Sequence, residues 1–379
     1  MRIGIVTGEF PPMRGGVGAY TELLARHLAD KGQQVHLFSR AGTHSETFPV
    51  AANVHAWGPG SLRAARRWAR DNRLQIVSVQ FQTAAFDMSP WVHFLPDTIG
   101  VPVVTTFHDL HFPYLFPKAG PLRDWIVMRL ARASAGVIVT NHEDEVQVRH
   151  LLRTILIPIA SNILAPLPRP FDPDPWRAQA GARADDFLLS YFGLLNRSKG
   201  LDILLDSLAA LRKAGIPARL VVIGGEVGSS DPSNAAHAAE IQALIARLEL
   251  APFVHFTGYL QDEIAVGSFL KASDMVVLPF RDGVSYRRGS LMAAIHYGCP
   301  VTTTLPRVEI PLFRDGRNML LVQPDNSVAL TEALRRYYQS PQLQSTLRLE
   351  AENLKHLFEW PHIAAYYINF FERVLGAQS

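Results

Sequence analysis

A glycine-rich loop near the start of the sequence is the first place where the backbone could bind an anion. Gly15, Gly16 and Gly18 stand between a short apolar run and a helix-like segment. Glycines let a ligand approach the backbone closely, and the first turn of a helix presents unpaired N–H groups to negative charge. A dinucleotide fingerprint differs, because its glycines follow the strand directly and a carboxylate ends the next strand, where this chain has Ser39 and Arg40. The loop predicts a phosphate contact, with a purely structural turn as the alternative.

A lysine in the second half of the chain could stabilise the same kind of charge. Lys199 follows an apolar run and opens a helix-like segment, and Arg197 lies two residues before it. A cation stabilises the negative charge that a phosphate leaving group gains more strongly in a site without water than in water. A solvated lysine at the start of a helix is the alternative.

A pair of arginines precedes a later apolar helix. Arg287 and Arg288 are followed by Gly289 and Ser290. Glycine then serine at a helix start is an N-cap arrangement that leaves N–H groups free for phosphate, and arginines add bidentate donors. Only one of two adjacent arginines is expected to point toward a ligand. The segment predicts a second phosphate contact.

One histidine stands at a position where parallel sheets bind ligands. His108 follows the apolar run Val103–Phe107, so it lies at the carboxyl end of an expected strand. A histidine with a structural role is the alternative.

Short apolar runs alternate with helix-length segments along most of the chain, which predicts parallel sheets covered by helices on both faces. The runs lack the polar alternation of a half-solvated strand. In the first half the expected strands are Arg2–Thr7, Gln34–Phe38, Ile76–Gln80, Val103–Phe107, Gly136–Thr140 and Thr154–Pro158, with helices including Gly18–Lys31 and Asp144–Leu152.

A proline-rich stretch divides this pattern in two. Five prolines lie between Leu164 and Pro175, a density incompatible with a helix or a central strand. Beyond it the expected strands are Phe187–Phe192, Arg219–Ile223, Val254–Thr257, Met275–Pro279 and Pro300–Thr304, and the expected helices are Leu201–Ala214, Ala235–Leu248, Glu263–Ala272 and Ser290–Tyr297. The sequence therefore predicts an α/β protein of two doubly wound domains. A last, aromatic helix over Pro361–Leu375 needs an apolar surface on which to dock.

Four stretches, taken in order, resemble the family-4 retaining glycosyltransferases of the GT-B fold (glycosyl transferases group 1). They are the Phe-Pro-Pro-x-x-Gly-Gly-x-Gly loop at residues 10–18, the strand end Thr105–Asp109, the segment Gly193–Gly200 and the segment Arg281–Pro300. The resemblance spans nearly the whole chain and implies two Rossmann-like domains facing an interdomain cleft. It implies an acceptor-side domain over residues 1–165, a nucleotide-sugar donor domain over 183–357, and a C-terminal helix over 358–379 that crosses back to the first domain. It also implies that His108, or its adjacent backbone, contacts the transferred sugar and that the Lys199 segment reaches the donor diphosphate.

The donor motif departs from the family pattern of two glutamates with seven residues between them. Without gaps, the two glutamate positions fall on Ser285 and Ala293, and a shifted register places Asp282 and Ser290 there. The contacts that those glutamates make with the donor sugar and the ribose are therefore in doubt.

A second departure concerns the arginine that the family carries after the first glycine, because Leu194 replaces it. Arg197 or Arg288 could supply the missing charge. We interpret the two departures as a phosphate-binding site that is formed by different residues; a site that has lost activity is the competing interpretation.

The resemblance implies transfer of a hexose from a nucleotide-diphosphate sugar to a hydroxyl of a glycan, lipid or small-molecule acceptor, with the anomeric configuration retained. We expect no cofactor and no metal, because Lys199, Arg288 and helix N-termini can take up the charge. No general base is assigned, since the leaving phosphate can serve. The alternatives are a nucleotide-sugar epimerase or hydrolase on the same fold and a non-catalytic nucleotide-sugar-binding subunit.

Composition bounds the partners and the compartment. A net charge of +3 does not support nucleic-acid binding. One cysteine, no signal-peptide pattern and no long apolar run together predict a cytoplasmic protein. A row of arginines could still hold it at the inner face of a membrane, although a solvated helix face is the commoner explanation. The row consists of Arg63, Arg66, Arg67, Arg70 and Arg73.

Overall fold

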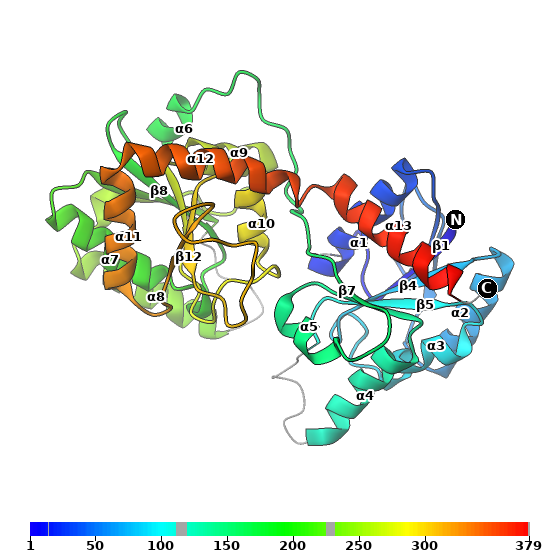
Figure 1. Cartoon of the computed structure of the whole chain (residues 1–379). Coiled ribbons are helices and arrows are strands. Elements are labelled where there is room, and N and C mark those ends of the chain that lie inside the picture. The colour runs from blue at the N-terminus through cyan, green and yellow to red at the C-terminus, as the bar shows by residue number, and fades with distance from the viewer. Residues whose placement is uncertain (14, 111–119, 225–231, 378–379) are drawn as a thin grey trace. The chain divides into compact units, whose positions relative to one another are not determined.

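The computed structural model describes residues 1–13, 15–110, 120–224 and 232–377, and it divides the chain into two compact units (Figure 1). The first unit contains Met1–Asn162 together with Trp360–Ser379, and the second contains Ile163–Glu359. Each unit has its own parallel sheet and its own hydrophobic core. The two-domain α/β fold predicted from the sequence is confirmed.

The first unit is built on a seven-stranded parallel sheet in the order β3-β2-β1-β4-β5-β6-β7. The strands are β1 Arg2–Thr7, β2 Gln34–Arg40, β3 Val50–Val54, β4 Ile76–Phe81, β5 Val103–Phe107, β6 Gly136–Val139 and β7 Thr154–Leu156. The helices are α1 Gly16–Asp30, α2 Pro59–Asp71, α3 Leu95–Thr98, α4 Gly120–Ala133, α5 His142–Val148 and α13 Trp360–Gly376, with a 3₁₀ turn, η1, over Pro90–Phe94. All residues of β4 and β5 are buried, as expected for strands with helices on both faces.

The second unit carries a six-stranded parallel sheet in the order β10-β9-β8-β11-β12-β13. Its strands are β8 Phe187–Gly193, β9 Ala218–Gly224, β10 Val254–Phe256, β11 Met275–Leu278, β12 Val301–Thr304 and β13 Leu320–Val322. Its helices are α6 Asp174–Gln179, α7 Leu201–Lys213, α8 Pro232–Arg247, α9 Glu263–Ala272, α10 Gly289–His296, α11 Ser327–Gln339 and α12 Pro341–His356, with 3₁₀ turns η2 over Arg197–Lys199 and η3 over Ala251–Phe253.

Every strand predicted from the sequence is present, and two strands were missed. β3 and β13 are both edge strands: β3 contains Asn53 and two alanines, and β13 is apolar but only three residues long. The proline-rich stretch also contains the start of α6, because Pro175 lies in its first turn, where the missing N–H group has no partner to lose.

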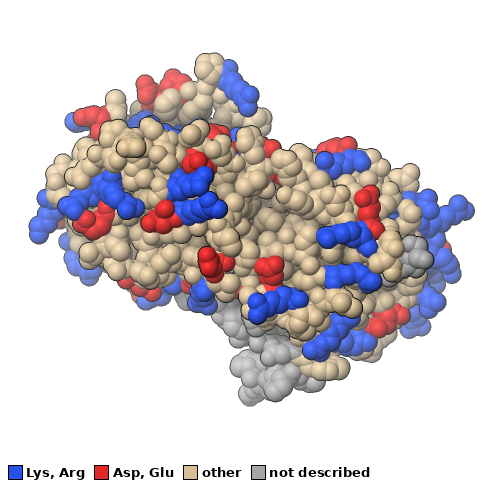
Figure 2. All heavy atoms as spheres, in the orientation of Figure 1, with Lys and Arg blue, Asp and Glu red and all other residues tan. Residues whose placement is uncertain are grey.

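The arginine-rich segment forms α2, whose apolar side packs into the core of the first unit. Trp68 is buried there with its ring centroid 5.2 Å from that of Phe38. Lys and Arg side chains gather along the right margin of Figure 2, on the side where Figure 1 shows α2. Packing against the sheet therefore accounts for the amphipathic pattern of the helix.

The aromatic C-terminal helix α13 belongs to the first unit and packs on α1. The Tyr20 hydroxyl donates to the Tyr367 hydroxyl at 3.2 Å, and the Trp360 indole donates to the Ser161 carbonyl at 2.7 Å. The helix thus finds its docking surface in the N-terminal part of the chain. None of the helices in the described ranges has the length and apolar character needed to cross a membrane.

Candidate functional site

Lys199 lies over the carboxyl end of β8 in the second unit. A side-chain Cβ placed at Gly193, the last residue of β8, would come within 2.5 Å of the Lys199 ammonium nitrogen. The ammonium donates no hydrogen bond to any residue that the structure describes. Burial, and then the charge of Arg288, lower the pKa of Lys199 from its ordinary value. Lys199 therefore lies at a strand end, as the sequence predicted, and Arg288 lies close enough to affect its pKa.

Arg281, which the sequence analysis did not single out, clamps the turn that carries Lys199. Its backbone N–H donates to the Ser198 carbonyl at 2.9 Å, and its Nε donates to the Arg197 carbonyl at 3.0 Å. Its guanidinium also forms ion pairs with Asp202 and Asp325. Arg281 follows β11, a neighbour of β8 in the sheet, so the pairing of these strands brings Arg281 to the turn that contains Lys199. A basic residue after an apolar run was the only sequence signal for it.

Arg288 and Asp282 form an ion pair with each other. The guanidinium carbon of Arg288 also lies 4.6 Å from the centroid of the Phe280 ring, and its Nε is buried without an acceptor among the described residues. The sequence analysis treated Arg288 as a phosphate contact and Asp282 as one position of a shifted donor motif. The structure makes them partners, so a change in one alters the charge that the other experiences.

The segment after Arg288 starts α10 without a side-chain cap. Arg288 itself occupies the N-cap position, and Gly289 and Ser290 are the first two helical residues. The expected serine cap is therefore absent, although the N–H groups of the first turn are left without a side-chain acceptor. Ser285 is buried, and its carbonyl accepts a hydrogen bond from the Arg288 N–H at 3.2 Å.

Arg197 does not join these cations. Its guanidinium forms an exposed ion pair with Glu240 of α8 at 2.6 Å. Of the two arginines considered as substitutes for the charge missing at Leu194, Arg288 is the one that influences Lys199.

His108 in the first unit lies just past the end of β5. Its Nε2 and the Gln80 side-chain oxygen are 2.9 Å apart, and its ring meets the Tyr20 ring edge-on at a centroid distance of 4.9 Å. Burial lowers the pKa of His108 to about 4, so the imidazole is neutral at physiological pH. The side chain can therefore exchange hydrogen bonds with a ligand, but it supplies no positive charge.

The glycine-rich loop already holds an anion from within the chain. The Glu9 carboxylate accepts hydrogen bonds from the N–H groups of Val17 at 2.9 Å and Gly18 at 3.1 Å, in the first turn of α1. A side chain at Gly15 would collide with this carboxylate, whereas one at Gly16 would meet no atom. The free N–H groups expected at this helix start are thus partly occupied by Glu9, because the loop folds its own carboxylate onto them.

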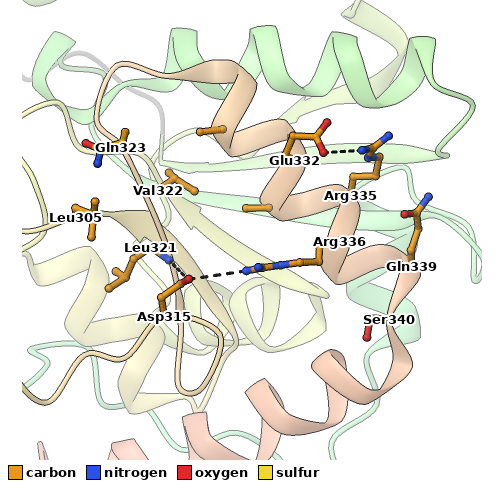
Figure 3. A pocket seen from close by; sticks show the side chains of 12 residues that line it. Leu305, Asp315, Leu321, Val322, Gln323, Glu332, Arg335, Arg336, Gln339 and Ser340 are labelled. Atoms are coloured by element: carbon orange, nitrogen blue, oxygen red, sulfur yellow. Dashed lines mark hydrogen bonds and ion pairs between the residues drawn. The ribbon is translucent and has the colours of Figure 1, made fainter.

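An open pocket of about 760 Å³ in the second unit contains none of the predicted site residues. It lies along β13 and α11, and Figure 3 shows its charged side chains paired with one another. Asp315 accepts from the Leu321 N–H at 2.9 Å and lies 4.0 Å from Arg336, while Arg335 pairs with Glu332 at 2.6 Å. The cations around Lys199 therefore remain the stronger candidate for ligand binding.

Comparison with known families matches most of the chain in two stretches. Residues 186–340 match the model described as glycosyl transferases group 1, and residues 14–155 match the model described as glycosyltransferase family 4. The chain belongs to the group 1 glycosyltransferases. The resemblance noted in the sequence is thereby confirmed.

Relatives of this glycosyltransferase are distant but cover much of its length. The D-inositol 3-phosphate glycosyltransferase of a Nocardioides species is 28% identical over 95% of this chain and 85% of that protein. The protein EpsD of Bacillus subtilis is 26% identical over 64% of this chain and 62% of its own length.

Solved structures confirm the GT-B fold. HepE from Anabaena in complex with UDP superposes with a TM-score of 0.77 at 18% identity, covering 98% of this chain and all of that one. The sucrose-phosphate synthase of Thermosynechococcus elongatus gives a TM-score of 0.74 at 21% identity and covers both chains in full.

The two glutamate positions of the donor motif hold residues of different character in this glycosyltransferase. Ser285 and Ala293 are both buried, and Asp282 is turned toward Arg288. Neither alignment of the motif restores a pair of free carboxylates.

Proposed function

We propose that this glycosyltransferase moves a hexose from a nucleotide-diphosphate sugar to an acceptor hydroxyl, retains the anomeric configuration and uses no metal. The observation that carries the proposal is the Lys199 ammonium at the carboxyl end of β8, which donates to no acceptor among the described residues and experiences the charge of Arg288. The neighbouring arginines are paired, Arg288 with Asp282 and Arg281 with Asp202 and Asp325.

The ammonium of Lys199, unpaired within the described ranges, favours an anionic ligand. Burial, and then the like charge of Arg288, disfavour the charged form of Lys199 and lower its pKa, which is a cost in free energy. A bound diphosphate would offset this cost by pairing with the ammonium, and the uncapped first turn of α10 would add N–H donors. Because the leaving group gains charge as the glycosidic bond breaks, the same groups would lower the barrier.

The comparisons support a nucleotide sugar as the donor class. HepE is described in complexes with UDP, with UDP and glucose, and with UDP-glucose. A relative in Mycobacterium tuberculosis, 23% identical over 74% of this chain, is named a GDP-mannose-dependent mannosyltransferase. A uridine or guanosine diphosphate is therefore the ligand to test first.

His108 takes a different role in this proposal. A neutral imidazole can accept a hydrogen bond from a hydroxyl of the transferred sugar, while the cations of the second unit bind the diphosphate. The exposed arginines of α2 would assist an anionic lipid acceptor only by surface charge, since the apolar side of that helix is buried.

Nucleotide binding is tested by thermal unfolding with UDP, GDP, uridine and guanosine. A diphosphate should raise the melting temperature well above its nucleoside, since ligand at a hundred times its dissociation constant adds about 2.7 kcal/mol to the stability. Lys199→Ala should lose most of this difference. Lys213→Ala, at the exposed end of α7, is the matched control and should keep it. Equal stabilisation by nucleoside and diphosphate would count against the site.

Turnover is tested by mass spectrometry with a panel of nucleotide sugars and cell extract as acceptor. A glycosylated product carrying the donor hexose is expected. Free hexose or a new nucleotide sugar without acceptor would instead indicate a hydrolase or an epimerase. Nucleotide binding with every donor left intact would indicate a non-catalytic subunit.

A further inference from the structure

A chain of buried hydrogen bonds runs from the C-terminal helix to His108 within the first unit. The Tyr20 hydroxyl donates to the Tyr367 hydroxyl at 3.2 Å, and the Tyr367 and Thr106 hydroxyls are 3.1 Å apart. The chain continues through Gln80, which contacts Thr106 on one side and His108 on the other. It therefore joins residues from α1, β4, β5 and α13.

The amide of Gln80 turns its nitrogen toward two hydroxyl groups and its oxygen toward His108. Its nitrogen lies 2.9 Å from the Ser78 hydroxyl and 3.5 Å from the Thr106 hydroxyl, and its oxygen lies 2.9 Å from His108 Nε2. An amide oxygen only accepts hydrogen bonds, so in this orientation of the amide Nε2 carries the proton. The remaining ring nitrogen, Nδ1, is then an acceptor.

We propose that Gln80 is a positioning residue that holds His108 in its Nε2–H tautomer, so that Nδ1 accepts a hydrogen bond from a hydroxyl of the bound sugar. The tautomer follows from the orientation of the Gln80 amide, whereas the contact with the sugar rests on the proposed function. Thr106 and Tyr367 support Gln80 from behind, which links the ring to the C-terminal helix.

The surroundings of His108 keep the ring neutral while Gln80 fixes it. The titratable side chains of this hydrogen-bonded chain are Tyr20 of α1 and Tyr367 of α13. Burial raises the pKa of Tyr367 to about 12 and raises that of Tyr20 well above its ordinary value. Both phenols thus stay protonated and neutral, and burial alone lowers the pKa of His108. A neutral imidazole needs its tautomer set by a neighbour, because either nitrogen can carry the proton.

The tautomer can be measured without any substrate, by two-bond ¹H–¹⁵N correlation spectra of the full chain labelled at histidine. The resonances of His108 are assigned by their loss in His108→Ala. We expect the Nε2–H pattern in the parent at pH 7 and a mixture of tautomers in Gln80→Leu. In Gln80→Glu the carboxylate should restore the Nε2–H pattern and move the titration midpoint of His108 upward by about 1–3 pH units. A parent spectrum with the Nδ1–H pattern, or an unchanged spectrum in Gln80→Leu, would overturn the proposal.

Two neighbouring threonines provide a matched pair if Gln80→Leu does not fold. Both are fully buried on β5, but Thr105 contacts Ser134 at 2.8 Å, whereas Thr106 belongs to the chain. Thr106→Val should alter the His108 spectrum, and Thr105→Val should leave it as in the parent. Equal effects of the two valines would show that general packing, not this chain, controls the ring.

Activity gives a second, separable readout. Gln80→Leu should lower kcat about five- to tenfold with little change in KM, the factor expected when one hydrogen bond no longer fixes the ring. If His108→Ala keeps full activity, the proposed contact with the sugar fails, while the spectra still decide the role of Gln80. A KM effect without a kcat effect in Gln80→Leu would contradict its role in orienting the reacting group.

Discussion

Arg288 and Asp282 show how a single contact changes the meaning of a motif. The sequence analysis considered them separately, as a phosphate contact and as a position of the donor motif, but they form one ion pair, and the charge of Arg288 acts on Lys199. We predict that Arg288→Ala weakens binding of the donor diphosphate by about 1.5–3 kcal/mol, the usual cost of losing a charge-assisted hydrogen bond. Asp282→Ala should weaken binding of the diphosphate less, because it leaves Lys199 and Arg288 in place and frees the Arg288 side chain to contact the phosphate.

A double-mutant cycle of the two changes, followed by calorimetry with UDP or GDP, measures their coupling. Arg287→Ala serves as the control for a change of charge in the same segment and should bind nearly as the parent does. If Asp282→Ala abolishes activity while both arginine variants behave as the parent, Asp282 is instead the remaining half of the ordinary donor motif.

His108 is predicted to act in the reaction and not in donor binding. His108→Ala should lower kcat more than it changes KM, because a contact that strengthens in the transition state appears mainly in kcat. The activity should show no ionisation of His108 between pH 6 and 9, since burial lowers its pKa to about 4. Steady-state kinetics across this range test both statements, and a histidine limb near pH 6.5 would contradict the second.

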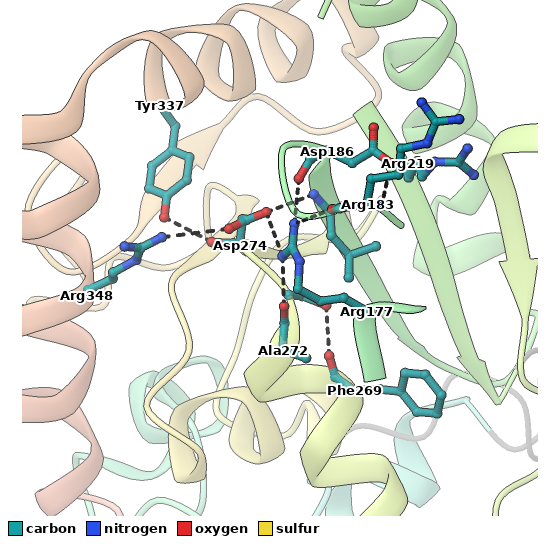
Figure 4. A network of polar contacts seen from close by, with 11 residues as sticks. Arg177, Arg183, Asp186, Arg219, Phe269, Ala272, Asp274, Tyr337 and Arg348 are labelled. Carbon is teal, nitrogen blue, oxygen red and sulfur yellow. Dashed lines mark hydrogen bonds and ion pairs between the residues drawn. The ribbon is translucent and has the colours of Figure 1, made fainter. Parts of the chain in front are cut away.

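At the scale of elements, a network of ion pairs and hydrogen bonds holds α6 against the rest of the second unit (Figure 4). Arg177 of α6 donates to Asp274 at 3.1 Å, to the Ala272 carbonyl at 3.1 Å and to the Asp186 carbonyl at 2.6 Å. Asp274 in turn accepts from the Leu188 N–H at 2.9 Å. The contacts lie where β8 and β11 begin, at the opposite ends of the strands from Lys199, so we assign them to stability.

Removing Arg177 should therefore lower the stability of the second unit without affecting ligand binding. Breaking a buried pair typically costs about 3–5 kcal/mol, and partial exposure of Asp274 places Arg177→Ala toward the low end. Arg183→Ala, an exposed arginine six residues later, is the matched control and should change the stability by less than about 0.5 kcal/mol. Urea unfolding measures both, and equal losses would show that the network contributes little.

For the whole molecule, two buried histidines make stability depend on pH. Burial lowers the pKa of both His93 and His108 to about 4, below the ordinary value of 6.5 that the unfolded chain approaches. Between these values the unfolded chain binds more protons than the folded chain, so stability falls as the pH falls from about 6.5 to about 4. Each group can contribute up to about 3 kcal/mol. Urea unfolding at pH 7.5 and 5 should show the loss, and His93→Phe should reduce it.

The sequence predicted the central strands well, because strands with helices on both faces leave continuous apolar runs. The edge strands were missed because β3 is interrupted by Asn53 and β13 is only three residues long. Lys199 was placed correctly because a strand end and a helix start bracket it. Arg281 and the Glu9 contact with α1 were missed, since both depend on side chains meeting across turns that residue spacing does not specify. The pairing of Arg288 with Asp282 was missed for the same reason.

The inclusion of α13 in the first unit has a consequence for how the protein is made. Phe370 and Phe371 are buried against that unit, and Gly136 of β6 lies directly beneath the Phe370 ring. During synthesis the last strand of the first sheet emerges from the ribosome slightly more than two hundred residues before the start of α13. The apolar surface around β6 that Phe370 and Val374 cover must stay exposed until the second unit has been translated. A chaperone that shields this face during translation would therefore matter more to the yield of this protein than to one whose domains are continuous in sequence.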